Sequence, residues 1–257
     1  IINPLKITFL GTGTSQGIPI IGSTHPVCLS EDFKDKRLRV SVLVEWGDLS
    51  VLIDCGPDFR QQMLRTNCTK IDAVLFTHEH SDHTAGLDDL RPFFFRQGAL
   101  DIYAQERVLQ SLYKRFDYIF KKNNKYPGVL TLNETQITET PFLIGTQTIT
   151  PINVLHNSLP IFGYRMGGFA YITDAKTVAD IEVEKLQGLD VLVVNTLRIE
   201  PHVSHFNLEE ALAFIKLVNP KKAYLTHISH HLGFHETVEK DLPTHVKLAY
   251  DQLQISI

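Results

Sequence analysis

Short runs of aliphatic and β-branched residues, each closed by a glycine or a polar turn, fill the first third of the chain. Runs of this length and composition are typical of β-strands, and the last of them is apolar enough for a buried strand. We predict strands in four of these runs, at residues 5–11, 39–47, 49–56 and 71–78.

Helical patterns appear in the middle of the chain and again near its end. Residues 104–120 carry apolar side chains at helical spacing. Residues 207–220 do the same; this helix should begin after a capping residue, Asn207 or Ser204, and stop before Pro220. Further strands are predicted at residues 146–156, 167–174, 189–195 and 221–227. Strands interleaved with helices in this order predict a layered α/β architecture.

Composition narrows the class of protein. The 257 residues, 43% hydrophobic and 21% charged, suit one globular domain over residues 1–257. The net charge of -4 gives no broad basic surface, so we expect no nucleic-acid partner. No apolar run approaches the ~20 residues that span a bilayer, so no membrane partner is expected either. Three irregularly spaced cysteines and the lack of a signal-peptide pattern predict a reduced, cytoplasmic protein.

The sequence THEHSDHTAG, at residues 77–86, holds the densest group of candidate metal ligands. His78 and His80, two residues apart where a predicted strand meets a loop, can reach one cation together. Asp82 and His83 are better placed for a second cation. Nitrogen and oxygen ligands without thiolate suit zinc, manganese or iron. A solvated histidine-rich loop is the alternative, but the position at a strand end favours a metal site.

Three later residues strengthen this interpretation. His156, Asp174 and His227 each end a predicted strand, as His78 does. Any one of them alone is more typical of a capping or hydrogen-bonding residue. Because strand ends in a layered α/β protein lie on a common edge, where sites are usually built, the four together predict one site.

With these residues the chain resembles the metallo-β-lactamase superfamily over essentially its whole length. The resemblance implies a four-layer αβ/βα sandwich that binds two divalent metal ions, zinc or manganese, with iron as a further option. It also implies a ligand set: His78, His80 and His156 for the first metal, Asp82, His83 and His227 for the second, Asp174 as a bridge, and Asp54 as a supporting residue that orients ligands. Histidine at position 80 is unlike the flavodiiron branch, and aspartate at 174 argues against antibiotic hydrolysis.

A pair of metal ions explains why so many ligands are present. Two cations ~3.5–4 Å apart lower the pKa of a bound water and stabilise charge on a phosphate group. We therefore predict a metal-dependent hydrolase in which Asp82, through its metal, takes part in catalysis.

The substrate is indicated by other stretches. GTGTSQGIP at residues 11–19 and HISHH at residues 227–231 resemble the PhnP-like branch, which includes the phosphoribosyl cyclic phosphate phosphodiesterase. The resemblance implies that His205 protonates the leaving alkoxide. His202 is the alternative acid, and helix capping is the alternative role of His205. The predicted function is a phosphodiesterase that acts on a small phosphate ester, either cyclic or open-chain.

One feature departs from this branch. PhnP-like members carry three cysteines that form a structural zinc site with a late histidine; here Ser23, His25 and Cys28 stand at the three cysteine positions, so that one cysteine is kept, and His230 matches the histidine. Serine is a poor zinc ligand, and a structural site normally needs four protein ligands. We therefore prefer an inert Cys28 thiol and a surface His25, with a weakened zinc site as the alternative.

Several alternatives stay open. Basic and aromatic residues alternate between Lys114 and Lys125, which suits a nuclease that processes tRNA 3′ ends; a solvated helix face with buried aromatics is the simpler interpretation. A thioester or lactone hydrolase would use the same metal site. A monomer and a homodimer are both compatible with the sequence. The arginines that would bind substrate are candidates only: Arg60, Arg91 and Arg165.

Overall fold

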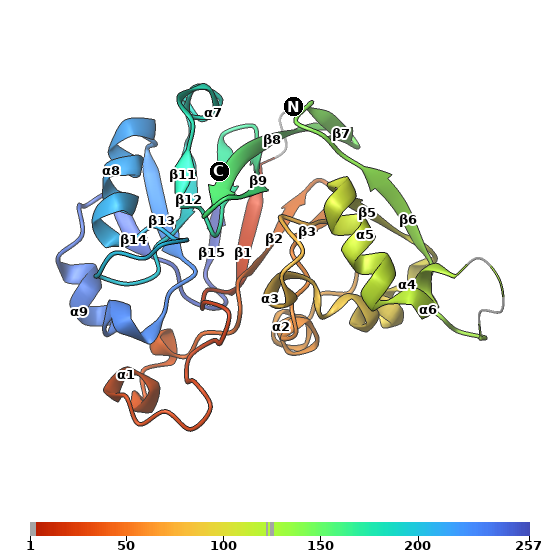
Figure 1. Cartoon of the computed structure of the whole chain (residues 1–257), viewed down its shortest axis with the longest axis horizontal. Helices are drawn as coiled ribbons and strands as arrows, with labels where there is room; N and C mark the ends of the chain where they lie inside the picture. Colours follow the sequence, from red (N-terminus) through yellow and green to blue (C-terminus); the bar gives the residue numbers. More distant parts are fainter. Residues whose placement is uncertain (1–3, 122, 124–125) are drawn as a thin grey trace.

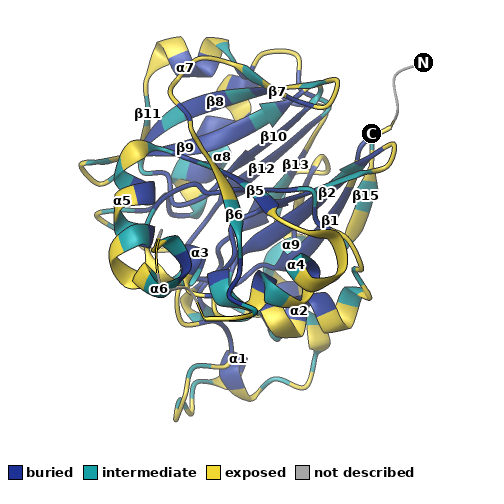
Figure 2. Ribbon diagram, turned by 90° about the vertical axis from the view of Figure 1, so that its right-hand side faces the viewer, coloured by how far each residue is buried: buried dark blue, intermediate teal, exposed yellow. Residues whose placement is uncertain are grey.

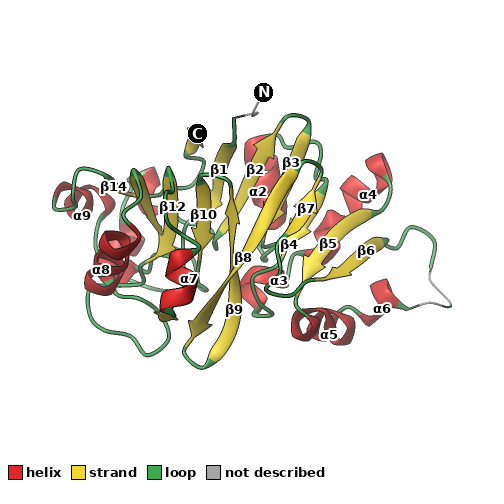
Figure 3. Cartoon of the chain, turned by 90° about the horizontal axis from the view of Figure 1, so that it is seen from above, coloured by secondary structure: helices red, strands yellow, loops and turns green. Residues whose placement is uncertain are grey.

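Two β-sheets face each other, and helices cover the outer face of each, as Figures 1 and 3 show. The structure is a computed structural model that describes residues 4–121, 123 and 126–257. The first sheet has the strand order β15-β1-β2-β3-β4-β5-β6. Its strands are β1 (Lys6–Gly11), β2 (Ser41–Trp46), β3 (Leu49–Ile53), β4 (Ala73–Leu75), β5 (Leu100–Ala104), β6 (Leu132–Gln136) and β15 (Gln254–Ser256).

The second sheet has the order β11-β8-β9-β10-β12-β13-β14, and β7 pairs with β8 outside that path. Strands β10, β12, β13 and β14 run parallel, and so do β3 to β6 in the first sheet. The strands are β7 (Phe142–Ile144), β8 (Gln147–His156), β9 (Leu159–Met166), β10 (Phe169–Ile172), β11 (Thr177–Val178), β12 (Val191–Asn195), β13 (Lys222–Thr226) and β14 (Val246–Leu248).

The helices fall into two outer layers. Against the first sheet pack α2 (Phe59–Thr66), α4 (Arg91–Gln97), α5 (Glu106–Arg115) and α6 (Asp117–Phe120). Against the second pack α1 (Pro26–Leu29), α7 (Asp180–Glu184), α8 (Leu208–Val218) and α9 (His235–Lys240). The short helix α3 (Ser81–Thr84) belongs to the loop after β4. Single 3₁₀ turns lie at Phe33–Asp35, Leu87–Leu90 and His230–Leu232.

The hydrophobic core is divided by the sheets into three parts. The part between the sheets includes Val44 from the first sheet and Tyr164 and Phe169 from the second, all buried. Two further clusters fill the spaces between each sheet and its helices. Figure 2 shows buried strands inside and exposed residues on the helices outside. The predicted αβ/βα sandwich of four layers is confirmed, whereas a single domain over residues 1–257 stays a prediction.

All eight predicted strands are present, and the helix at 207–220 is confirmed as α8. Asn207, not Ser204, is its cap: the Asn207 side chain accepts from Glu210 N, and the Glu210 side chain accepts from Asn207 N. The prediction of one helix over 104–120 is wrong. The backbone breaks at Phe116, with φ −120° and ψ 42°, and the turn after it folds the ring of Phe120 to 4.9 Å from that of Tyr113.

Strand β9 was not predicted, because Pro160 and Gly163 in it are more typical of a turn. A Cβ atom at Gly163 would lie 2.8 Å from the carbonyl oxygen of Tyr171, so this strand needs glycine to approach β10 closely. Cys28, Cys55 and Cys68 are all free. Among the described residues, no helix has both the length and the apolar character to cross a membrane.

Candidate metal centre

The predicted ligands gather at one edge of the sandwich, where strands from both sheets end. His78 lies three residues beyond β4, His156 ends β8, Asp174 lies two residues beyond β10, and His227 directly follows β13. Within the described residues the ligand atoms form three overlapping groups, each with its atoms within 4.8 Å of one another. The groups are His78, His80 and His156; Asp82, His83, Asp174 and His227; and His156, Asp174 and His205.

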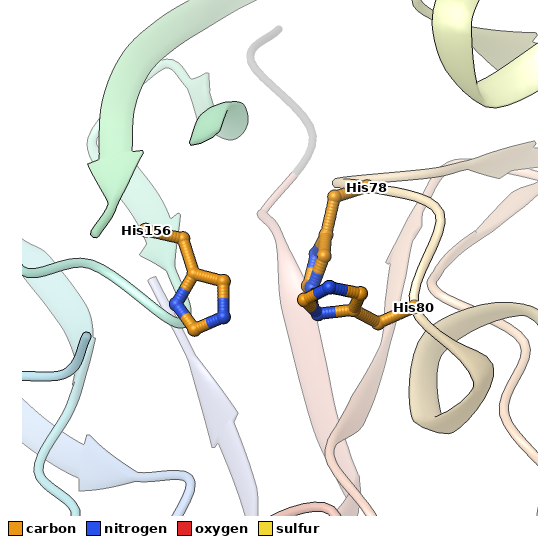
Figure 4. A group of neighbouring side chains, drawn as sticks. All are labelled: His78, His80 and His156. Carbon is orange, nitrogen blue, oxygen red and sulfur yellow. Dashed lines mark hydrogen bonds between the residues drawn. The ribbon is translucent and has the colours of Figure 1, made fainter. Parts of the chain in front are cut away.

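The first group joins the two sheets. His78 Nε2 lies 3.0 Å from His80 Nδ1, on the loop that follows β4. His156 faces this pair from the end of β8 (Figure 4), with its ring centroid 5.2 Å from that of His80 and 5.7 Å from that of His78. Three imidazoles therefore converge from two separate segments of the chain.

The second group mixes imidazoles and carboxylates. His83 Nε2 lies 3.1 Å from Asp82 Oδ2 and 3.3 Å from Asp174 Oδ2. His227 Nε2 lies 3.1 Å from Asp174 Oδ1 and 3.9 Å from Asp82 Oδ2. Asp174 thus directs one carboxylate oxygen to each of two histidines, at the position of the predicted bridge.

Asp54 lies fully buried beneath both groups. Its Oδ2 accepts from His83 Nδ1 at 2.6 Å and from the Thr77 hydroxyl at 2.8 Å, and its Oδ1 accepts from Thr77 N at 2.8 Å. Since the Thr77 proton is committed to Asp54, the Thr77 oxygen accepts from His78 Nδ1, 3.0 Å away. The predicted supporting carboxylate therefore orients one histidine of each group, and Thr77, which no sequence pattern marks as functional, relays its effect to His78.

Backbone carbonyls fix His156, a second histidine of the first group. His156 Nδ1 donates to the carbonyl oxygens of Asp174 and Ser204, at 3.0 and 2.9 Å. With the proton on Nδ1, the Nε2 lone pair is free to bind a cation.

The backbone at the site is held in an uncommon conformation. Asp54, Asp174 and His227 have φ values of 64°, 56° and 56°, in the left-handed region that non-glycine residues seldom adopt. Asp54 and His227 directly follow a strand, and Asp174 lies two residues beyond one. Such conformations persist where surrounding structure imposes them, and they are typical of functional sites.

The second group has strongly coupled charges. Burial lowers the pKa of His227, but the carboxylate of Asp174 outweighs it and brings the pKa to about 9. Burial also lowers the pKa of His83, yet Asp82 and Asp174 raise it well above its ordinary value. In turn the two imidazoliums hold the pKa values of Asp82 and Asp174 below their usual range, against the effect of burial. Without a cation, two protons therefore balance the two carboxylates.

The donor set fits two divalent cations. His83 Nε2 and both ring nitrogens of His227 are buried and have no hydrogen-bond partner among the described residues. Buried polar atoms normally have partners, so these nitrogens are arranged for something other than protein. Nitrogen and oxygen donors without thiolate suit zinc, manganese or iron. The first group would hold one ion and the second group the other.

We expect metal binding to release protons. At pH 7 the raised pKa values keep His83 and His227 protonated in the metal-free chain, and a cation must displace both protons. The affinity for the metal ion should therefore rise with pH up to about 9, the pKa at which His227 loses its proton even when no cation is bound. Titration calorimetry of zinc binding in buffers of different ionisation enthalpy measures the protons released; a value near zero at pH 7 would contradict the coupling.

His205 is buried beside both ligand groups, within reach of His156 and Asp174. Its ring stacks on that of His227 at 4.8 Å, and its Nδ1 is 3.7 Å from Asp174 Oδ1. Burial, with the neighbouring imidazole of His227, lowers the pKa of His205 to about 3. The alternative acid His202 lies 5.2 Å from His205, ring to ring. Asn207, not His205, caps α8, so the capping role proposed for His205 is wrong.

The structure does not assemble the weakened zinc site. His25 and His230 are close, with ring centroids 4.7 Å apart, but Cys28 is buried in the hydrophobic cluster on the outer side of the second sheet. His25 Nδ1 is already used, because it accepts from Val27 N and caps α1. No metal-capable group of the described residues contains these side chains. The preferred interpretation of an inert Cys28 thiol and a surface His25 stays a prediction; the Cys28 side chain is buried, and His25 is partly exposed.

The arginine candidates lie apart from these groups, whereas the basic segment contacts the loop of the first group through Arg115, which donates to the Glu79 carbonyl oxygen. Arg165 donates to the carbonyl oxygens of Gly167, Lys185 and Gln187, at the far end of β9 from the site. Arg91 pairs with Asp88, and Arg60 is exposed on α2. Lys114 and Arg115 are exposed on α5 while Leu112 of the same helix is buried, which agrees with a solvated helix face. Lys122 and Lys125, also part of that prediction, lie outside the described residues.

Two facing sheets that carry histidines and aspartates along one edge define a hydrolase of the metallo-β-lactamase fold. The family model of the beta-lactamase superfamily domain matches residues 50–228, and the chain belongs to that superfamily. The crystal structure of a new diphosphatase from the PhnP family is 37% identical, with a TM-score of 0.94 over 100% of this chain and 98% of that one. The chain therefore lies in the PhnP-like branch, as the sequence predicted.

Curated relatives extend the comparison. The chain is 40% identical to an octanoyltransferase of Porphyromonas gingivalis over 256 residues, which are 98% of this chain and 52% of the relative. It is 29% identical to a ribonuclease Z of an Exiguobacterium species over 169 residues, 64% of this chain and 49% of the relative. The chain thus spans about half the length of these relatives.

Proposed function

We propose that the chain is a two-metal phosphodiesterase that acts on a small phosphate ester. The observation that carries the proposal is the pair of ligand groups that meet at Asp174, whose side chain contacts His83 and His227 and whose carbonyl oxygen binds His156. Two metal ions, when bound, would supply an activated water and positive charge for the phosphate oxygens. The similarity to a PhnP-family diphosphatase also supports phosphate chemistry, and diphosphates belong in the substrate panel.

The chain's own residues would hold and move the protons. Asp54 keeps a proton on Nδ1 of His83, and Thr77 keeps one on Nδ1 of His78, so that both Nε2 atoms can bind metal. His205 is neutral before substrate binds, since its pKa is about 3. A phosphate anion beside its ring would favour the protonated form, which can then donate to the leaving oxygen.

The test is hydrolysis of bis(p-nitrophenyl) phosphate by the chain loaded with manganese or zinc. His78→Ala should abolish measurable turnover, because it removes a ligand of the first group. His245→Ala is the matched control: this histidine is exposed and lies on the segment before β14. Absence of hydrolysis by the metal-loaded wild-type chain would overturn the proposal.

We expect the role of His205 to depend on the leaving group. His205→Ala should slow hydrolysis of an ester with an alkoxide leaving group by about 100-fold, since a general acid contributes that much or more. Loss of p-nitrophenolate, which leaves without protonation, should change little. Rates for both esters measured in His205→Ala and His202→Ala identify the acid; a selective loss in His202→Ala alone would assign the role to His202 instead.

A thioester hydrolase is the second candidate, and the relative named octanoyltransferase favours it. The same preparation should be assayed with an octanoyl thioester and with precursor tRNA, the substrate of the nuclease alternative. Faster turnover of the thioester than of any phosphate ester would replace the leading proposal.

A further inference from the structure

Helix α5 contacts the metal-binding loop at Glu79, the residue between His78 and His80. Arg107 Nε donates to Glu79 Oε1 at 2.8 Å, and Arg115 donates to the Glu79 carbonyl oxygen at 3.0 Å. The Glu79 side chain is 21% exposed and that of Arg107 36%, so the ion pair is partly shielded from water. Two arginines of one helix therefore hold the short segment that presents both histidines.

Arg107 also contacts the opposite sheet. Its second guanidinium nitrogen donates to the carbonyl oxygen of Pro160 at 2.9 Å. Pro160 is the second residue of β9, and the residue before it, Leu159, pairs directly with His156 across the β8–β9 hairpin. One guanidinium thus connects the loop that carries His78 and His80 to the hairpin that carries His156.

The contacts of Arg107 lie close to the first ligand group, whose histidines come from both sheets. His78 and His80 follow β4 of the first sheet, whereas His156 belongs to β8 of the second, and nearly 80 residues of chain separate them. Figure 4 shows His156 on one side and the other two imidazoles on the opposite side. Ligand groups must be held within about 0.5 Å of their productive positions, so the spacing of the two sheets has to be fixed near these residues.

We propose that Arg107 is a positioning residue that sets the spacing of the first metal group by bridging Glu79 and Pro160. The inference rests on the proposed metal centre. A planar guanidinium holds its donors in a fixed geometry and can satisfy a carboxylate and a carbonyl together, whereas the single ammonium of lysine does so poorly. The hydrogen bonds of Arg107 within the described residues go to Glu79, Gln105 and Pro160, none of which is a predicted metal ligand, so its effect passes through Glu79 and the hairpin.

Cobalt(II) titration by calorimetry tests the proposal one group at a time. In a His83→Ala background, where only the first group is complete, Arg107→Gln should weaken cobalt binding about tenfold, the lower end of the effect of residues that support ligands. In a His78→Ala background, where only the second group is complete, Arg107→Gln should leave affinity unchanged. Arg107→Lys should recover part of the loss, and Glu79→Gln should weaken the same group.

Lys114→Gln is the matched control, because Lys114 is an exposed cation on the same helix. Equal losses in both backgrounds would mean a general structural role and overturn the proposal, as would an unchanged affinity in the His83→Ala background. An increase in KM with unchanged cobalt affinity would assign Arg107 to substrate binding. Cobalt binding without any hydrolysis would overturn the proposed activity and leave this inference standing; a wild-type chain that binds no cobalt would overturn both.

Discussion

Replacing Asp174 by asparagine is expected to lower diester hydrolysis by about three orders of magnitude, equivalent to ~4 kcal/mol of transition-state stabilisation. Asparagine has nearly the same shape but has no charge and offers only one oxygen. Asp174 directs one oxygen to His83 and the other to His227, 3.3 and 3.1 Å away. The substitution therefore removes the negative charge at the point where the ligand groups meet.

The loss should accompany a change in metal content. Elemental analysis after dialysis is expected to find fewer than two metal ions per Asp174→Asn chain, while circular dichroism remains that of the wild type. Asp241→Asn is a suitable control, because that aspartate is exposed at the end of α9. An Asp174→Asn variant that keeps more than a tenth of the activity would exclude a bridging role.

The strand ends could be predicted from the sequence because each is a local pattern. His78, His156, Asp174 and His227 all follow apolar runs, and parallel strands place their carboxyl ends at one edge. The side-chain contacts beneath them have no such signature. Thr77 is an ordinary residue at a strand end, and its hydrogen bonds to Asp54 and His78 depend on how β3 and β4 lie side by side.

Contacts that connect the two sheets also have no signature in the sequence. Arg107 belongs to a helix with an ordinary amphipathic pattern, and only the packing of α5 brings it to Glu79 and Pro160. The less favoured alternative of a weakened zinc site at His25, Cys28 and His230 came from the family resemblance, and the packing of the described residues does not bring these side chains into one metal-binding group. Cys28 lies on the buried side of α1, while His25 caps that helix.

Asp54→Asn is the second substitution for which we expect a large effect, through the tautomer of a histidine. In the wild type, Asp54 Oδ2 accepts two hydrogen bonds, one from His83 Nδ1 and one from the Thr77 hydroxyl. The asparagine side chain of the variant has two orientations. In one, its NH₂ group faces the His83 and Thr77 hydroxyl donors; in the other, its NH₂ group faces the backbone donor Thr77 N. In both, donor meets donor. The conflict is relieved when His83 moves its proton to Nε2, which then can no longer bind a metal ion.

Metal affinity of the second group should therefore fall by about 10–100-fold in Asp54→Asn, with a parallel loss of activity at limiting metal. Excess zinc should restore part of the activity, because the metal competes with the wrongly placed proton. Thr77→Val separates the two branches of the network: it removes the relay to His78 and should weaken the first group while His83 keeps its bond to Asp54. Zinc titrations of the two variants, in the His78→Ala and His83→Ala backgrounds used above, measure each group by itself. If Asp54→Asn weakened neither group, the buried carboxylate would serve the stability of the fold and not the orientation of the ligands.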